Sequence, residues 1–196
     1  MLPNRLDDAA LDRLFVQGRS YQGFRSEPIS DDTVRQIYDL ARLGPTATNS
    51  TPGRFVFVRS AAAKERLKPH LMPMNVDKTM GAPCCVIVAY DTRFFEKMPE
   101  LFPGRDMSKM FTDEKLIAET AFRNSSLQGA YLMLAARALG LDCGPMSGFN
   151  AQTLDQEFFP DGRWKSNFLC NIGYGDPEKL WPRLPRLKFE DACLDL

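Results

Sequence analysis

The sequence predicts an α+β layered domain. Short apolar runs typical of strands, such as 84–90, intermix with helical patterns without the repeated strand–helix period of a doubly wound sheet. The long segment 114–139 keeps helical spacing throughout. The chain has 196 residues, 44% of them apolar, with no internal repeat, linker or low-complexity tract. We therefore expect a single domain over residues 1–196, large enough to bury a core without metal or disulfide support.

The first elements are a helix, a loop and a strand. Segment 29–44 predicts a helix, because Ser30 suits an N-cap, acidic residues follow it, and apolar residues form one stripe. Segment 44–53, GPTATNSTPG, is rich in turn-forming residues and predicts a loop. Segment 54–59, RFVFVR, predicts a strand.

The middle of the chain predicts a short helix over 61–71, stopped by Pro73, and then a strand over 84–90. The run CCVIVAY in this strand is continuously apolar, which is typical of a strand buried on both faces. Segment 93–111 shows no sustained period despite its many Phe and Met residues. We expect a mobile excursion there.

The C-terminal part predicts a long helix over 114–139 that stops at Gly140, and a core strand over 168–172. The apolar face of the long helix is wide, which indicates that the helix is central or lies in a subunit interface. The tail from Leu180 holds prolines and alternating Leu and Arg residues, which predicts an extended arm.

Composition excludes several classes of partner. The 25 basic and 25 acidic residues leave no net charge to attract a phosphate backbone, so we expect no nucleic-acid partner. No apolar run approaches the roughly 20 residues of a membrane-spanning helix. The N-terminal stretch MLPNRLDDAALDRLF lacks the apolar region of a secretory signal. These features predict a cytoplasmic protein without a membrane partner.

The cysteines and the single histidine limit the chemistry. Five cysteines without a C-x-x-C pair indicate neither a disulfide framework nor a zinc site. Cys84 and Cys85 lie in the apolar run CCVIVAY, which predicts buried thiols rather than a redox pair. His70 is the only histidine, so metal sites with several histidines are excluded, and no G-x-S-x-G motif supplies a serine nucleophile. We expect His70 at a turn or surface. No P-loop occurs, and Gly173-Tyr174-Gly175 lacks the third glycine of a Rossmann site.

Four polar segments remain as candidates for one planar, anionic ligand. Segment 18–24 places the guanidinium of Arg19 beside a serine hydroxyl, which suits phosphate oxygens. Segment 44–50 offers hydroxyl and amide groups, and the glycines of 144–149 permit close backbone approach to a flat ligand. Segment 183–186 supplies further guanidinium groups. Taken singly, each segment also fits an ordinary helix end, turn or solvated tail.

The order of these motifs resembles the FMN-dependent nitroreductase family. The family pattern contains an Arg-Ser pair, a P-[ST]-x-x-N-x-x-P loop, an asparagine before the second core strand, a P-x-x-G-F turn and a basic C-terminal segment. The matching residues are Arg19-Ser20, 45–52, Asn75, 145–149 and Arg183. The resemblance covers essentially the whole chain. It is strongest to the branch of the malonic semialdehyde reductases of pyrimidine degradation, through ETAFRNSS, GPMSGF, NIGYGD and RLPRL.

The resemblance implies an α+β fold with an antiparallel core sheet flanked by helices, and a homodimer with swapped termini that binds FMN between its subunits. It assigns the phosphate to Arg19, Ser20 and Arg183, the flavin lining to Pro45, Thr46, Ala47 and Asn49, the pyrimidine edge to Asn75, and the backbone facing N5 to Ser147 and Gly148. Pro145 and Met146 belong to the same cofactor-binding turn.

The chain departs from the family pattern at Gln22, where many relatives carry Lys or Arg. A neutral amide donates a weaker hydrogen bond than a cation does, so the resemblance predicts a lower flavin reduction potential than in lysine-bearing relatives. Gly18 and Trp181 also stand where relatives often carry basic residues. We therefore expect phosphate binding to depend mainly on Arg19 and Arg183.

The implied activity is ping-pong hydride transfer from NADH or NADPH through flavin N5 to a small acceptor, with no catalytic nucleophile or metal. The nearest branch implies reduction of 3-oxopropanoate to 3-hydroxypropanoate, with Arg105, Lys109 and Arg123 as candidate cations for the carboxylate. Segment 102–111 suits either a lid or an apolar interface patch. The alternatives are a broad nitroaromatic or quinone reductase, a non-catalytic FMN storage or sensor protein, and a cofactor-free interaction domain.

Overall fold

A four-stranded antiparallel sheet forms the centre of the computed structural model, which describes residues 5–196. Residues 1–4, part of the stretch in which no secretory signal is expected, lie outside the described residues. The strand order is β1 (Gly53–Val58), β2 (Cys84–Asp91), β4 (Trp164–Gly173) and β3 (Asp142–Met146). The predicted α+β class and antiparallel sheet are confirmed.

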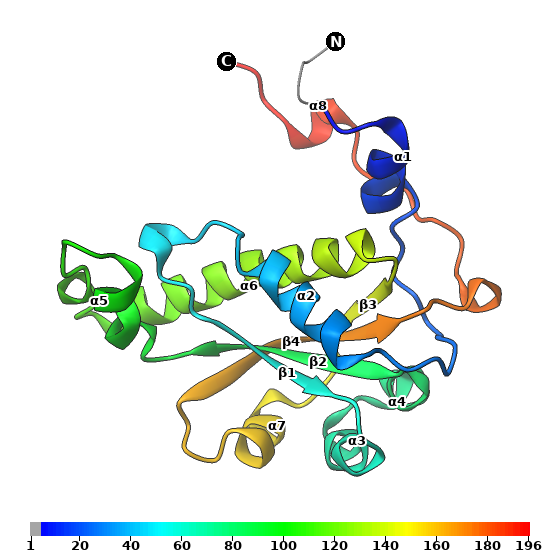
Figure 1. Cartoon of the computed structure of the whole chain (residues 1–196), viewed down its shortest axis with the longest axis horizontal. Coiled ribbons are helices and arrows are strands. Elements are labelled where there is room, and N and C mark those ends of the chain that lie inside the picture. The colour runs from blue at the N-terminus through cyan, green and yellow to red at the C-terminus, as the bar shows by residue number, and fades with distance from the viewer. Residues whose placement is uncertain (1–4) are drawn as a thin grey trace.

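Helices cover both faces of this sheet (Figure 1). One face carries α2 (Asp31–Ala41) and α6 (Glu114–Ala138), and the other carries α3 (Ala61–Leu67), α4 (Pro73–Gly81) and α7 (Ala151–Phe158). Successive side chains of a strand point to opposite faces, so both helical layers bury residues of β2. Cys84, Val86 and Val88 pack in the cluster under α2 and α6, and Cys85, Ile87 and Ala89 pack in the other cluster. The prediction of a strand buried on both faces is confirmed.

The two helices predicted from strong patterns begin where their caps indicate. The Oγ atom of Ser30 accepts a hydrogen bond from the backbone N of Thr33 at 3.1 Å, which satisfies one free N–H at the start of α2. Asp113 caps α6 in the same way. Gly140 follows α6 with a φ of 87°, a conformation that favours glycine. Helix α6 packs on all four strands and on α2, so it is central, as its wide apolar face indicates.

Among the strands and the α-helices longer than four residues, three are missing from the sequence prediction. Pro73 begins α4 instead of only ending the preceding helix, because the first turn of a helix does not use the missing N–H of proline. Segment 142–146, whose glycine and proline favour a turn, is strand β3 because it pairs along β4. Helix α7 begins at an Asn150 cap, whose Oδ1 accepts from the backbone N of Thr153 at 3.1 Å.

Segment 93–111 is more regular than predicted. It holds α5 (Met98–Leu101) and turns of 3-10 helix at Phe94–Lys97 and Ser108–Met110. Phe94 and Met98 are fully buried in a small cluster that the start of α6 also joins. The segment therefore has short regular turns and a buried core of its own, because its Phe and Met residues pack against one another, and its mobility stays a prediction.

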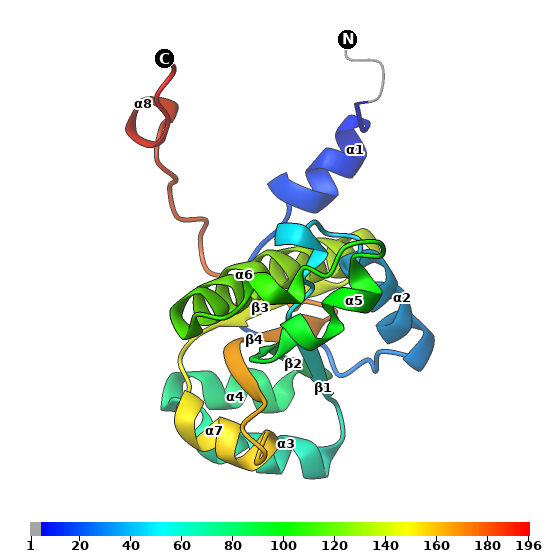
Figure 2. The ribbon, with the colours of Figure 1, turned by 90° about the vertical axis from the view of Figure 1, so that its left-hand side faces the viewer.

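Both ends of the chain rise away from the body on the side of α6 (Figure 2). The N-terminal end holds α1 (Asp8–Leu11), continued by a π-helical turn at Asp12–Val16. The C-terminal end is extended, as predicted, except for α8 (Phe189–Ala192). Further short turns of 3-10 helix lie at Ala47–Asn49, Lys68–His70 and Pro177–Lys179. Among the described helices, none is long and apolar enough to cross a membrane.

Candidate functional site

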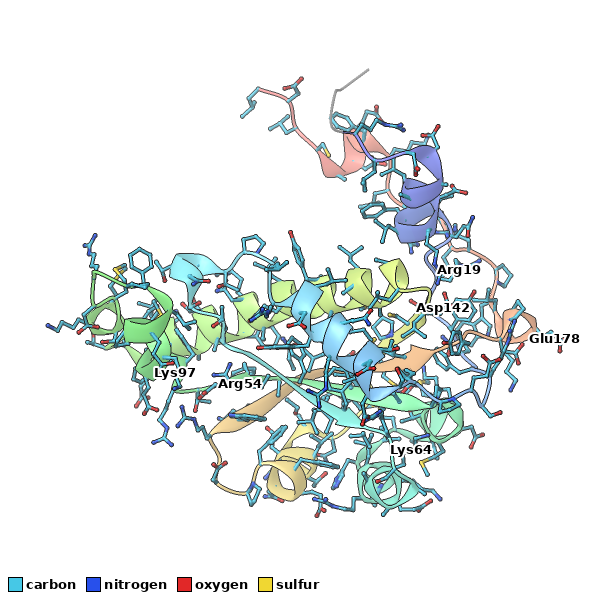
Figure 3. The ribbon with its side chains drawn as sticks, viewed as in Figure 1. Arg19, Arg54, Lys64, Lys97, Asp142 and Glu178 are labelled. Carbon is cyan, nitrogen blue, oxygen red and sulfur yellow. The ribbon has the colours of Figure 1, made fainter. Side chains whose placement is uncertain are left out.

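The Arg19-Ser20 pair lies against strand β3. Ser20 forms a parallel bridge with Cys143, and the backbone N of Tyr21 donates to the backbone O of Cys143 at 3.0 Å. A Cβ atom at Gly144 would lie 2.6 Å from the backbone O of Tyr21, so this contact requires glycine. Figure 3 shows Arg19 near the junction of the N-terminal segment and the body. Pairing with β3 therefore places the predicted phosphate ligands at one end of the sheet.

The segments that carry Arg19 and Arg183 lie side by side although they come from opposite ends of the chain. Arg19 donates from Nη2 to the backbone O of Trp181. Arg183 donates from Nη2 to the backbone O of Val16 and, at 3.2 Å, to that of Gly18. The structure thus places the segment of Arg19 and Ser20 beside the segment of Arg183, and their role in phosphate binding stays a prediction.

Asn75 and the 145–149 turn lie in direct contact. The Nδ2 atom of Asn75 donates to the backbone O of Gly148 at 2.7 Å, and the backbone N of Met72 donates to the same oxygen at 3.0 Å. A Cβ atom at Gly148 would lie 2.4 Å from that Nδ2 atom, so only glycine allows this approach. Ser147 is exposed beside it, while Asn75 is buried.

Lys78 stands beside Gln22, and the sequence analysis missed it. The Nζ atom of Lys78 donates to the Oε1 atom of Gln22 at 3.2 Å. Lys78 follows Asn75 by three residues on α4, so both side chains lie on one face of the helix. Burial lowers the pKa of Lys78. The site therefore has a cation next to the neutral amide, a feature that the N-x-x-K spacing reveals only once a helix is recognised there.

A buried amide on the sheet holds the last turn of α4. The Nδ2 atom of Asn171, in β4, donates to the backbone O of Lys78 at 3.3 Å and to Oγ1 of Thr79 at 3.2 Å. Asn171 is fully buried. The central sheet therefore determines where Lys78 lies.

The predicted flavin-lining loop forms a separate group of residues. The backbone N of Ala47 donates to Oδ1 of Asn124 on α6 at 2.8 Å, and Nδ2 of Asn49 donates to the backbone O of Leu101 at 2.8 Å. Thr46 Oγ1 accepts from the backbone N of Thr51 at 3.1 Å, and Pro45 is exposed.

The loop lies above α6 near α5, whereas strand β3, which Ser20 contacts, lies at the other end of α6 (Figure 1). Arg19 and Arg54, which lies three residues after the loop, are well apart in Figure 3. We call residues 19–22, 75–78, 145–148 and Arg183 the phosphate group of residues, and 45–51 the loop group. A single chain does not bring the two groups together.

The candidate substrate cations lie with the loop group. Arg105 and Lys109 belong to the segment that follows α5, and Nζ of Lys109 lies 3.8 Å from Oδ2 of Asp106. Arg123 is exposed on α6, directly before the Asn124 that contacts the loop. All three cations are exposed, which leaves them accessible to a small anionic ligand.

The remaining nucleophiles and metal ligands are structural. Cys84, Cys85, Cys143 and Cys170 are buried free thiols, which confirms the prediction for Cys84 and Cys85, and Cys193 is an exposed free thiol. Burial raises the pKa of Cys84 to about 12. His70 lies at a turn, with Nδ1 2.8 Å from Oγ1 of Thr153, as expected. Residues 5–196 hold no cluster of three or more metal-ligating side chains.

The antiparallel sheet between two helical layers is the architecture of a nitroreductase. The Nitroreductase family profile matches residues 16–174, and the chain belongs to this family. It is 65% identical over 193 residues to a protein of Rhodopseudomonas palustris (strain TIE-1) named "Putative NADH dehydrogenase/NAD(P)H nitroreductase", with 98% of each chain covered.

Two solved structures have a similar fold. The "putative nitroreductase ydfN" of Bacillus subtilis has a TM-score of 0.86 at 22% identity, over 97% of this chain and 100% of that chain. A "putative nitroreductase in complex with FMN" from Exiguobacterium sibiricum 255-15 has a TM-score of 0.86 at 19% identity, over 98% of this chain and 99% of that chain. These similarities show that the chain has a nitroreductase fold.

Proposed function

We propose that this protein is an FMN-dependent NAD(P)H oxidoreductase. The observation that carries the proposal is the phosphate group of residues, in which guanidinium donors from both ends of the chain lie at the same end of the sheet as a buried amide, a cation and a glycine turn. The FMN-bound structure from Exiguobacterium sibiricum supports the choice of cofactor. Bound FMN would supply the hydride chemistry, which explains why the chain needs no nucleophile or metal.

The donor set of this chain fits FMN. The guanidinium groups of Arg19 and Arg183, with the hydroxyl of Ser20, would hold the phosphate through charge-assisted hydrogen bonds. Asn75 and Lys78 would bind the polar edge of the isoalloxazine, together with Gln22. The backbone at Ser147 and Gly148 would face the ring, on a turn that Asn75 holds through its hydrogen bond to the backbone O of Gly148.

The loop group would complete the site from a second copy of the chain. Ala47 and Asn49 of this loop contact α6 and the end of α5 rather than the phosphate group of residues, so the loop would reach a flavin held by the phosphate group of the second copy. Apolar side chains on the open face of α6 and on the C-terminal arm support a homodimer, because such exposed surfaces favour burial against a partner. They include Phe122 and Leu127 on α6, and Leu187, Phe189 and Leu194 on the arm.

The proposed acceptor is 3-oxopropanoate, which would be reduced to 3-hydroxypropanoate. An acceptor with a carboxylate needs a cation near the flavin, and Arg105, Lys109 and Arg123 are exposed beside the loop group. The second candidate is a nitroaromatic or quinone acceptor. The name of the Rhodopseudomonas palustris relative, which includes NAD(P)H nitroreductase, favours this alternative.

A spectroscopic titration tests the proposal. The purified protein should show the visible absorption of bound FMN, and anaerobic NADH or NADPH should bleach it. The bleached protein should recover its absorption on addition of 3-oxopropanoate faster than on addition of a nitroarene. Faster recovery with the nitroarene would support the second candidate. A protein that stays oxidised with both nicotinamides would be a storage or sensor protein, and one that remains colourless after soaking in FMN would refute the proposal.

Light scattering tests the dimer. The FMN-loaded protein should have twice the mass of one chain at micromolar concentration. A monomer that retains FMN would contradict the division of the site between two copies.

A further inference from the structure

Three side chains of α6 contact segment 44–53, one directly before the loop group, one within it and one shortly after it. A Cβ atom on Gly44 would lie 2.6 Å from the nearest atom of the Tyr131 ring, so the ring occupies the space that a side chain would need. Asn124 Oδ1 accepts from the backbone N of Ala47 at 2.8 Å. Gln128 Oε1 accepts from the backbone N of Gly53 at 2.6 Å. Residues spaced by three and four positions share one face of a helix, so α6 presents a continuous row of contacts to the loop.

The loop between these contacts has a strained backbone. Thr48, Asn49 and Thr51 have φ values of 51°, 53° and 37°, although none of them is glycine. Left-handed φ values are unfavourable for residues with a side chain, and most of all for β-branched threonine. The loop keeps this conformation only if surrounding contacts hold it.

The two amides of α6 are suited to hold the loop. Asn124 and Gln128 are 3% and 4% exposed, so the hydrogen bonds they accept are shielded from competing water. A Cβ atom at Gly53 would lie 2.6 Å from Oε1 of Gln128, so the glycine leaves the space that the amide occupies. The loop and the helix are therefore complementary in both shape and hydrogen bonding.

We propose that Asn124 and Gln128 are positioning residues that hold loop 45–51 in its strained conformation before FMN binds. The inference rests on the proposed function and extends it to two residues to which the sequence analysis assigns no role. Neither residue needs to touch the cofactor. When their hydrogen bonds to Ala47 and Gly53 are lost, the loop relaxes, and FMN binding must restore the strained form at the expense of affinity.

Hydrogen exchange and FMN binding test the inference in matched variants. Asn124→Leu and Gln128→Met remove the acceptors while keeping similar volume, and Asn124→Asp and Gln128→Glu keep an acceptor oxygen. We expect Asn124→Leu and Gln128→Met to raise the exchange rates of the Ala47 and Gly53 amides in the FMN-free protein by about tenfold or more. The FMN dissociation constant should rise by a similar factor. The acidic variants should restore both quantities to within about threefold of wild type.

Two further variants make the test decisive. Gln36→Met, on the exposed surface of α2, is the control for the loss of a helical amide and should change neither quantity. Gly53→Ala disturbs the Gln128 contact from the loop side and should act like Gln128→Met, even if a variant of α6 fails to fold. Unchanged exchange at Ala47 and Gly53, or faster exchange with unchanged FMN affinity, would overturn the inference. A wild-type protein without FMN affinity would instead refute the proposed function, while the exchange rates still report whether α6 holds the loop.

Discussion

Replacing Asp91 with asparagine should destabilise the protein strongly, because this carboxylate joins three segments at the end of β2. It accepts hydrogen bonds from Nη2 of Arg54 at 2.8 Å, from Nε of Arg163 at 3.1 Å and from the backbone N of Arg93 at 2.9 Å. Arg54 in turn donates to the backbone O of Thr51 and Gly53, at the end of the loop group. Asp91 is 2% exposed.

The expected loss of folding free energy follows from the burial of Asp91 and of the two arginine side chains that it binds. Removing one member of a buried ion pair costs about 3–5 kcal/mol. The side chains of Arg54 and Arg163 are 23% and 27% exposed, and Arg163 keeps a second partner in Glu96 at 2.9 Å. Both guanidinium groups therefore retain some solvation, which places Asp91→Asn at the lower limit, about 3 kcal/mol. For a domain of this size the melting temperature should fall by roughly 6–12 °C.

Thermal denaturation followed by circular dichroism, at fixed protein concentration and near neutral pH, measures this loss. Asp31→Asn is the matched control, because Asp31 also pairs with an arginine, Arg59, but its side chain is 75% exposed. An exposed pair contributes about 0–1 kcal/mol, so the control should melt within a few degrees of wild type. Equal losses in the two variants would refute the assignment of Asp91 as a buried junction.

The pH dependence gives a second measurement. Burial raises the pKa of Asp91, but the hydrogen bonds from Arg163 and from the backbone of Arg93, with the charges of Arg54 and Arg163, outweigh it, so the pKa lies below the ordinary value of 3.8. A lowered pKa in the folded protein means that the carboxylate stabilises the fold above the ordinary pKa. This contribution is lost as the pH falls through the folded-state value. The stability difference between wild type and Asp91→Asn should therefore shrink below pH 3.8, and a constant difference would contradict the ion pair.

Three further predictions concern the proposed flavin site and the thiols. Lys78→Met should lower the midpoint potential of bound FMN and Gln22→Lys should raise it, because positive charge stabilises the reduced, anionic cofactor. A spectroelectrochemical titration in which Lys78→Met had the higher potential of the two variants would exclude an electrostatic role of these positions. Arg183→Gln should raise the FMN dissociation constant about tenfold or more through loss of a charge-assisted bond, and an unchanged constant in a fluorescence titration would remove Arg183 from the phosphate site. Among the described thiols, iodoacetamide should modify only Cys193 in the native protein, because the other four are buried. Burial also raises the pKa of Cys84 to about 12, so a label found on Cys84 by mass spectrometry would contradict its burial in the core.

The elements that sequence predicts correctly have local causes. Ser30 caps α2 with its own side chain, and Gly140 ends α6 through its own backbone conformation. The run at 84–90 is apolar on both faces because helices cover both faces of β2. In each case the determining interaction lies within a few residues of the pattern, or follows from burial alone.

The elements that sequence misses depend on distant partners. Strand β3 contains Gly144 and Pro145, which favour a turn, and it is a strand because it pairs with residues 169–173 of β4. The aperiodic segment 93–111 is ordered by contacts among its own Phe and Met residues and with the start of α6. Neither partner is visible in a window of the local sequence.

The same difference between local and distant causes applies to the candidate site. The motifs identify Arg19, Asn75 and Arg183 by type and order, but they carry no information on which of these residues meet. Lys78 becomes part of the site only because α4 places it one turn after Asn75, and because the buried amide of Asn171 holds the backbone of that turn on the sheet. The cation beside Gln22 thus comes from an element that local sequence does not predict, so the electrostatics of a nitroreductase site cannot be judged from the residue at one motif position. The charge must be counted over every element that the central sheet brings to the site.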